Sequence, residues 1–271
     1  MPKVEKGGAR TAKRCIFCGG GKLTREHLWP EWAAPLLPGG RNPQNYDIAA
    51  IYHAVTGVAS QLRDYRRQGP ASSKRLRVVC KPCNSGWMSR LEEAARPILT
   101  PMAQGQPLVL SADMQRTLAA WIAMKIIVAQ HNIIVAEVTG ESARAALQAR
   151  REIPEGLRIW LWRCGEFRWR SRYDQHAMTV AAPGGEFDDS GRPNIHDVTF
   201  GFGDLLVNAL YVRAEGLDLG CAPVERFALQ LWPLTGRDLS WPPDAILADG
   251  ADEVSLALIH AIRGAEPQFV E

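Results

Sequence analysis

The sequence predicts an α+β fold, and three observations lead to that prediction. Two Cys-x2-Cys pairs, at 15–18 and 80–83, indicate a small zinc-stapled module within residues 1–100. A mostly apolar stretch of about 20 residues after Ser111 has the pattern of a buried scaffold helix with a serine N-cap. Several short strand-like segments follow it and predict a small C-terminal antiparallel sheet. We therefore expect two domains that meet near residue 100, the second being residues 101–271.

The composition is that of a globular protein, with 46% apolar and 23% charged residues in a chain of 271. No apolar run approaches the roughly 18 residues that span a bilayer. The first residues also lack the apolar core of a secretory signal. We therefore expect a cytoplasmic protein with no membrane partner.

Charge is unevenly distributed along the chain. Residues 1–100 hold 17 Lys and Arg against 7 Asp and Glu, which gives +10, and the remaining residues hold 15 against 22, which gives −7. The two parts add up to the net charge of +3. A basic first part favours a polyanionic partner, above all nucleic acid. The alternative is a chance asymmetry in a protein with no such partner.

The cysteines give the sharpest signal in the sequence. Four of the six form the two pairs: Cys15, Cys18, Cys80 and Cys83. Disulfides are rare in a reducing compartment, and a Cys-x2-Cys pair on a tight turn supplies half of a tetrahedral zinc site. A redox dithiol is the competing interpretation, although neither pair lies between an apolar strand and a long helix. We expect Cys164 and Cys221 to be buried as small hydrophobic residues.

Polar residues with catalytic potential lie next to both cysteine pairs. Glu26 and His27 come near the end of a predicted strand at 23–28, and neighbouring strand residues point to opposite faces. Asn84 directly follows the second pair and precedes a predicted helix that Pro97 should end. Each residue alone has an ordinary interpretation: a solvated Glu26, a packed His27, and an Asn84 that caps the helix.

The order Cys-x2-Cys, acidic-His, Cys-x2-Cys-Asn and helix resembles the HNH endonuclease superfamily in its zinc-stapled form, over residues 12–97. The resemblance implies a ββα-metal fold and hydrolysis of phosphodiester bonds, with DNA as the expected substrate. By position, Glu26 and Asn84 would hold a catalytic Mg²⁺ or Mn²⁺, and His27 would be the general base. An imidazole suits that role at neutral pH, and carboxylate and amide oxygens suit a hard cation.

The chain departs from the family pattern in three places. Glu26 stands where the family usually has Asp, and Asn84 stands where it often has His. The segment before Cys80 is unusually long, and the family's middle asparagine has only Asn42 and Asn45 as candidates. These differences leave open an inactive descendant that binds DNA without cutting it. A zinc-held module for protein interaction is a third possibility.

The long segment at 36–77 carries basic residues among tyrosines, which could neutralise phosphates and stack on bases. The basic candidates are Arg63, Arg66, Arg67, Lys74, Arg75 and Arg77. The alternative is an exposed polar loop.

The sequence suggests no function for the region after residue 100. Its sequence predicts a second helix before Pro154, a hairpin within 157–174 and a third strand at 176–182. Further strands are predicted around 196–203, 205–213 and 226–233, with a closing helix at 252–263. One hairpin strand alternates aromatic residues with arginines, which are Arg168, Arg170 and Arg172.

Overall fold

The computed structural model describes most of the chain and confirms the mixed helix-and-sheet class. The described residues are 14–36, 44–53, 58–68, 75–131, 138–164, 173–179, 193–213, 217–218, 228–244, 246–247 and 268–269. The predicted helix at 252–263, the arginines at 168–172 and Cys221 lie outside them. None of the helices in these ranges is long and apolar enough to cross a membrane.

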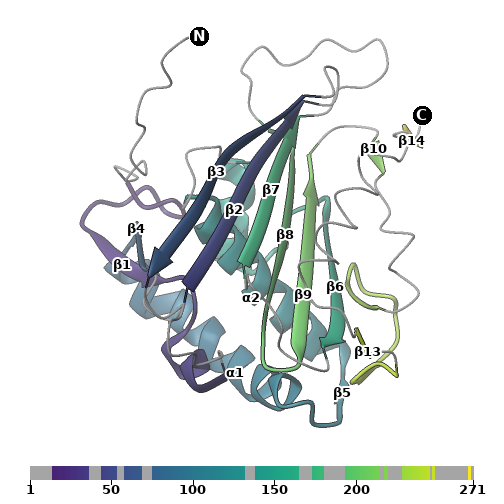
Figure 1. Ribbon diagram of the computed structural model, residues 1–271. Helices are drawn as coiled ribbons and strands as arrows, with labels where there is room; N and C mark the ends of the chain where they lie inside the picture. Colours follow the sequence, from purple (N-terminus) through teal and green to yellow (C-terminus); the bar gives the residue numbers. More distant parts are fainter. Residues whose placement is uncertain are drawn as a thin grey trace.

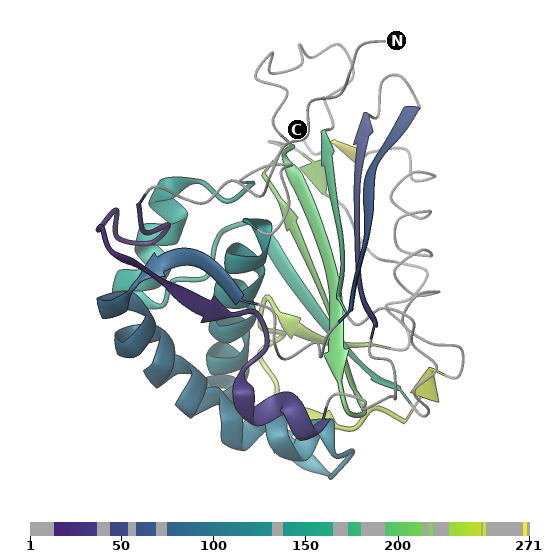
Figure 2. The ribbon, with the colours of Figure 1, turned by 60° about the vertical axis from the view of Figure 1, so that its left-hand side comes forward.

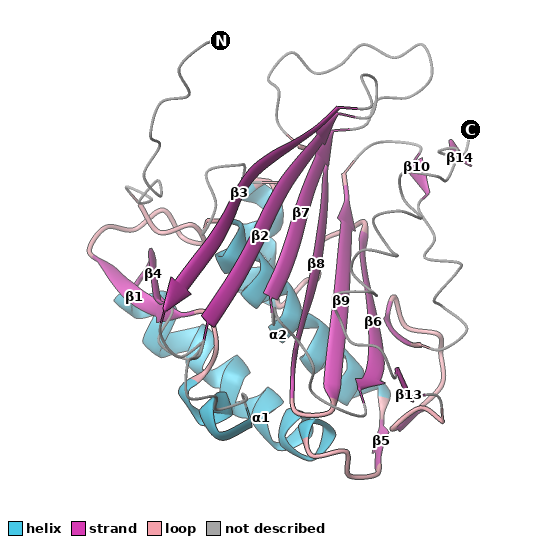
Figure 3. Cartoon of the chain, in the orientation of Figure 1, coloured by secondary structure: helices cyan, strands magenta, loops and turns pink. Residues whose placement is uncertain are grey.

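A large sheet forms one layer of the molecule (Figures 1 and 3). Its strands, in spatial order, are β11 (Leu229–Trp232), β6 (Leu157–Cys164), β9 (Leu205–Val212), β8 (Ile195–Phe202), β7 (Tyr173–Thr179), β2 (Gln44–His53) and β3 (Val58–Gln68). An eighth strand, β13 (Ile246–Leu247), pairs with β6 in parallel. The strands predicted around 196–203, 205–213 and 226–233 are thereby confirmed as β8, β9 and β11.

Two features of this sheet differ from the prediction. The hairpin β2–β3 comes from the segment before residue 77 and extends the sheet, because β2 pairs in parallel with β7. The sheet is therefore neither small nor wholly antiparallel, and this part of the segment is no loop. The first strand of the hairpin predicted within 157–174 is β6, but β6 pairs with β9 and β11, and most of the predicted second strand lies outside the described residues. The third strand predicted at 176–182 overlaps β7. Strands that follow each other in sequence often pair, but here the β8–β9 hairpin lies between β6 and β7.

Helices cover one side of the sheet (Figure 2). They are α1 (Ser89–Ala103), α2 (Ala112–Gln130) and α3 (Glu141–Arg150). The predicted scaffold helix is confirmed as α2, and the Ser111 side chain accepts a hydrogen bond from the Met114 amide at 3.4 Å. From Leu118 onward every α2 residue is buried, and Trp121 meets Phe200 of β8 edge-on at 6.4 Å. This part of the helix has no solvent face because α2 packs against α1 and against the sheet.

Small strand pairs complete the described fold. They are β1 (Leu23–His27) with β4 (Arg75–Cys80), β5 (Leu108–Leu110) with β12 (Leu239–Trp241), and β10 (Leu217–Asp218) with β14 (Gln268–Phe269).

The core is continuous across residue 100. It includes Cys15 and Trp87 from the region of the paired cysteines and Trp121 and Phe200 from the scaffold. The expected boundary falls inside α1, which runs past Pro97 to Ala103, so the prediction that this proline ends the helix is wrong. A proline removes one helical hydrogen bond, but burial of neighbours such as Leu99 offsets that loss.

A buried histidine joins α2 to the sheet and gives a pH-dependent stability. His196 on β8 lies 3.2 Å from Gln130 Nε2 through its Nδ1 and 3.1 Å from Gln175 Oε1 through its Nε2. This pattern fits a neutral ring that accepts at Nδ1 and donates at Nε2. Burial, with a smaller contribution from His176, lowers the pKa of His196 from 6.5 to about 3.

We expect the free energy of unfolding to fall as the pH drops below 6.5, by about 1.4 kcal/mol per pH unit at most. The unfolded chain takes up a proton at His196 in this range, whereas the folded chain does so only near pH 3. Urea unfolding of wild type and His196→Gln between neutral and mildly acidic pH measures this. The variant should be less stable at neutral pH and should show a flatter pH dependence. Equal slopes would contradict the assignment.

Candidate metal centre and the adjoining polar site

The four paired cysteines converge in space although they come from two distant segments. Their Sγ atoms all lie within 4.8 Å of one another, and Cys18 and Cys80 approach to 3.4 Å. A tetrahedral zinc with Zn–S bonds of ~2.3 Å holds its sulfurs ~3.8 Å apart, so this cluster fits a zinc ion. In the run of glycines after Cys18, Gly19 has the positive φ of 69° that the tight turn was expected to need.

Without a metal ion, the pKa values of the cysteine thiols differ from one another. Burial acts to raise the pKa of Cys15, but backbone hydrogen bonds, from Cys18 first, lower it to about 7. Burial raises the pKa of Cys80 and of Cys83. Four thiolates cannot coexist at this distance without a cation, so a bound metal ion would provide the charge that lets all four ionise.

The cysteine cluster fixes a strand pair against the start of a helix. β1 pairs antiparallel with β4, with Leu23 opposite Cys80. The chain then enters a π-helical turn, Cys83–Met88, that is kinked at Gly86 and continues into α1. The first cysteine turn packs on this helix through Phe17, whose ring meets Trp87 edge-on at 4.9 Å.

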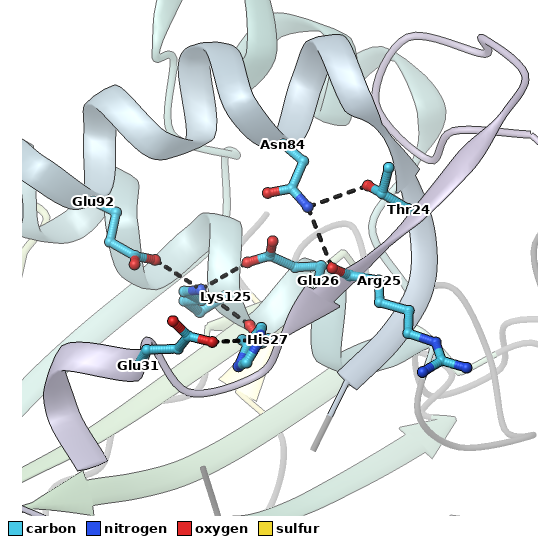
Figure 4. Close-up of polar contacts among 8 residues, drawn as sticks. All are labelled: Thr24, Arg25, Glu26, His27, Glu31, Asn84, Glu92 and Lys125. Atoms are coloured by element: carbon cyan, nitrogen blue, oxygen red, sulfur yellow. Dashed lines mark hydrogen bonds and ion pairs between the residues drawn. The ribbon is translucent and has the colours of Figure 1, made fainter. Parts of the chain in front are cut away.

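Asn84 points from the helical turn toward β1. Its Nδ2 donates to Thr24 Oγ1 at 3.2 Å and to the Arg25 carbonyl at 3.4 Å. Pro82 occupies the N-cap position of this turn, so the alternative that Asn84 caps the helix is wrong. The structure thus brings Asn84 beside the strand residues that precede Glu26 and His27 (Figure 4).

Glu26 points inward and forms an ion pair with Lys125, which was not among the site residues expected from the sequence. The carboxylate is buried, and its Oε1 lies 2.9 Å from Lys125 Nζ on α2. The same ammonium lies 3.0 Å from Glu92 Oε2 on α1 and donates to the His27 carbonyl at 3.2 Å (Figure 4). The prediction of a solvated Glu26, the ordinary alternative, is therefore wrong.

The side chain of His27, the last residue of β1, contacts a second acidic residue, Glu31. Its Nε2 lies 3.2 Å from Glu31 Oε1, in the short 3₁₀ helix Glu31–Leu36, and Arg75 Nη2 approaches the same oxygen at 3.6 Å. The imidazole is one-fifth exposed. Its Nδ1 has no hydrogen-bond partner among the described residues. A carboxylate at Nε2 favours the tautomer with the proton on Nε2, which leaves the lone pair on Nδ1.

The structure distributes the expected substrate-binding residues over two strands. Arg75 and Arg77 lie exposed on β4, and Arg77 Nε donates to the Leu23 carbonyl at 3.3 Å. Arg63, Arg66 and Arg67 lie on β3. Asn45, a candidate for the family's middle asparagine, is on β2 opposite Arg67. Lys74 and Asn42 are outside the described residues.

Three residues of the site were missed at the sequence level: Glu31, Glu92 and Lys125. Only Lys125 had a visible signal, because it is the one charged residue between Thr117 and Gln130 in an otherwise apolar helix. A charge in such a place is buried on folding and needs an acidic partner. Cys164, by contrast, is buried as predicted, and burial raises its pKa to about 12.

The arrangement fits a zinc ion in the cysteine cluster but not a divalent ion on Glu26. Among the described residues, the four cysteines are the one convergent group of three or more His, Cys, Asp or Glu side chains that could hold a metal. Lys125 Nζ, a cation, already lies 2.9 Å from Glu26 Oε1. Asn84 turns its amide nitrogen toward Thr24 and Arg25.

Comparison with protein-family models, with curated proteins and with solved structures finds no match for this chain.

Proposed function

We propose that this chain is a zinc-stapled endonuclease of the HNH type that hydrolyses phosphodiester bonds, with DNA as its substrate. One observation carries the proposal. The cysteine cluster holds β1 against the start of the helix, so that Asn84 of the helical turn contacts β1, the strand that ends at His27. This is the order and the strand–strand–helix arrangement that the resemblance implies.

In this proposal His27 is the general base. Its unpartnered Nδ1 would accept a proton from the attacking water, and Glu31 would fix the ring through Nε2. An unperturbed imidazole has a pKa of about 6.5, which suits a base near neutral pH. Nδ1 is buried in the structure, so substrate binding would have to open the approach to this atom.

Exposed basic residues support a nucleic-acid partner. Lys22 and Arg25 at β1 and Arg75 and Arg77 on β4 are exposed on neighbouring strands. Arg75 lies opposite His27 in the strand register. Such groups attract phosphates without reading sequence.

The resemblance also implies a catalytic Mg²⁺ or Mn²⁺. Because Lys125 holds Glu26, we derive no catalytic step through such an ion. The same contact favours a second candidate function, a zinc-stabilised DNA-binding protein without catalysis.

Incubation of the zinc-loaded protein with supercoiled, linear and single-stranded DNA, in Mg²⁺, Mn²⁺ or EDTA, tests the proposal. We expect nicking of supercoiled DNA and binding that weakens with salt, with a slope of about −0.9 per phosphate contact in log–log form. Binding with this salt dependence but no cleavage in any condition would replace the nuclease with the DNA-binding module. Neither cleavage nor salt-dependent binding would remove nucleic acid as a partner.

A further inference from the structure

We propose that Lys125 is the resident cation of a site formed by Glu26 and Glu92, and that it positions the strand end that carries His27. The site for a cation on Glu26 would then be filled permanently by a side chain of the protein. Its consequence for catalysis rests on the proposed function, but the occupancy of the site does not.

The hydrogen bonds of Lys125 are complete. An ammonium has three N–H donors, and three oxygens surround Nζ: Glu26 Oε1 at 2.9 Å, Glu92 Oε2 at 3.0 Å and the His27 carbonyl at 3.2 Å. The lysine comes from α2, and its partners come from β1 and α1. Three elements from distant parts of the sequence therefore meet at one nitrogen.

Burial makes this contact specific. The Lys125 side chain is 5% exposed and that of Glu26 is 9% exposed, whereas Glu92 retains 26%. A buried ammonium is costly unless it is paired and fully hydrogen-bonded, and this one is both. Burial acts to lower the pKa of Lys125, but Glu26 first and Glu92 second raise it above its usual value. The lysine therefore stays charged at neutral pH.

The same oxygens would suit a divalent ion if the ammonium were absent. Two carboxylates and a carbonyl are hard ligands of the kind that Mg²⁺ and Mn²⁺ bind. Their distances to Nζ, 2.9–3.2 Å, are those of hydrogen bonds and exceed the ~2.1 Å of Mg–O bonds. A divalent ion would have to displace Lys125 and draw the ligands inward by ~1 Å.

Lys125 also contacts His27, the residue proposed as the general base. Lys125 donates to the carbonyl of His27 itself, and the ring of His27 then meets Glu31. The ammonium thus fixes the backbone from which the imidazole projects. Lys125 is a positioning residue, since it touches no reacting atom.

Manganese binding to zinc-loaded protein, followed by electron paramagnetic resonance without DNA, tests the occupancy. Lys125→Met removes the charge and nearly keeps the volume, so we expect it to gain one Mn²⁺ site at least ~10-fold tighter than any in the wild type. The double variant Lys125→Met/Glu26→Gln should lose that site. A wild-type Mn²⁺ site that Glu26→Gln abolishes would overturn the proposal, and so would a folded, zinc-loaded Lys125→Met that gains no site.

Mn²⁺ binding to a Glu92 variant and the kcat of two Lys125 variants also test the proposal. If Lys125→Met does not fold, wild type is compared with Glu92→Gln, whose substituted side chain is partly exposed. Equally weak Mn²⁺ binding supports the resident lysine, and a wild-type site that this variant removes refutes it. Where nicking is observed, Lys125→Arg should keep more of kcat than Lys125→Met, with KM for DNA unchanged. Equal kcat in the two variants would refute the positioning role.

Discussion

Replacing Cys80 with Ser, or removing zinc with a chelator, is expected to unfold the region around β1, β4 and the start of α1. The cysteine cluster links these elements, and the unfolded chain offers no preformed site, so the binding free energy of the metal contributes to folding. We expect a loss of more than about 4 kcal/mol in the free energy of unfolding. Elemental analysis and thermal unfolding by circular dichroism measure the effect.

Cys164→Ser is the matched control for this experiment. Cys164 is as buried as Cys80 but lies at the end of β6 and outside the cluster. Burying its hydroxyl should cost about 1–3 kcal/mol while one zinc per chain remains bound. A native protein without zinc, together with a Cys80→Ser variant as stable as the wild type, would refute the zinc centre.

The disruption should spread beyond the metal site because the core is continuous. Phe17 and Trp87 meet edge-on near the cysteines, and the core that contains them also contains Trp121 of α2 and Phe200 of β8. Loss of zinc should therefore lower the unfolding temperature of the whole protein as a single transition.

Local patterns in the sequence predicted the parts of the site that depend on near neighbours. The cysteine spacing predicted the cluster, the alternating strand predicted that Glu26 and His27 take different partners, and Ser111 marked the start of α2. Each of these depends on a few consecutive residues, where turn geometry, side-chain alternation and capping operate.

The features that were missed depend on contacts between distant residues. Lys125 and Glu26 are 99 positions apart, and no local pattern connects them. Strands β2 and β3 join the sheet through β7, a parallel pairing that bridges more than a hundred residues of chain. The continuation of α1 past Pro97 also depends on packing, since propensity alone ends the helix there.

Because Glu26 is paired with Lys125, a substitution at Glu26 affects the stability of the protein as well as its activity. Glu26→Gln leaves the buried ammonium of Lys125 with one carboxylate in place of two, so a loss of activity would include a loss of stability. The resemblance treats Glu26 as a ligand, and in that case more Mn²⁺ or Mg²⁺ should partly restore activity. With Lys125 as the resident cation, added metal should restore none.

His27→Ala is the cleaner test of chemistry, and we expect it to reduce nicking by about 10²- to 10⁴-fold. Zinc content and DNA affinity should remain unchanged, because a base acts on the water in the transition state and adds little to ground-state binding. Stability should change by no more than about 1 kcal/mol, since the ring is partly exposed and its Nδ1 has no partner among the described residues. Nicking rates at saturating DNA measure the effect.

Glu31→Gln tests the residue that orients the base separately from the base itself. The amide oxygen can still accept the Nε2 proton of His27, but the negative charge beside the ring is lost. We expect a loss of about 10-fold or less in the nicking rate, because the amide still orients the ring. A His27→Ala variant that nicks DNA as fast as the wild type would show that His27 is not the base. In that case the unpartnered Nδ1 would have no catalytic role, and the Glu31 contact would serve only to pack the strand end.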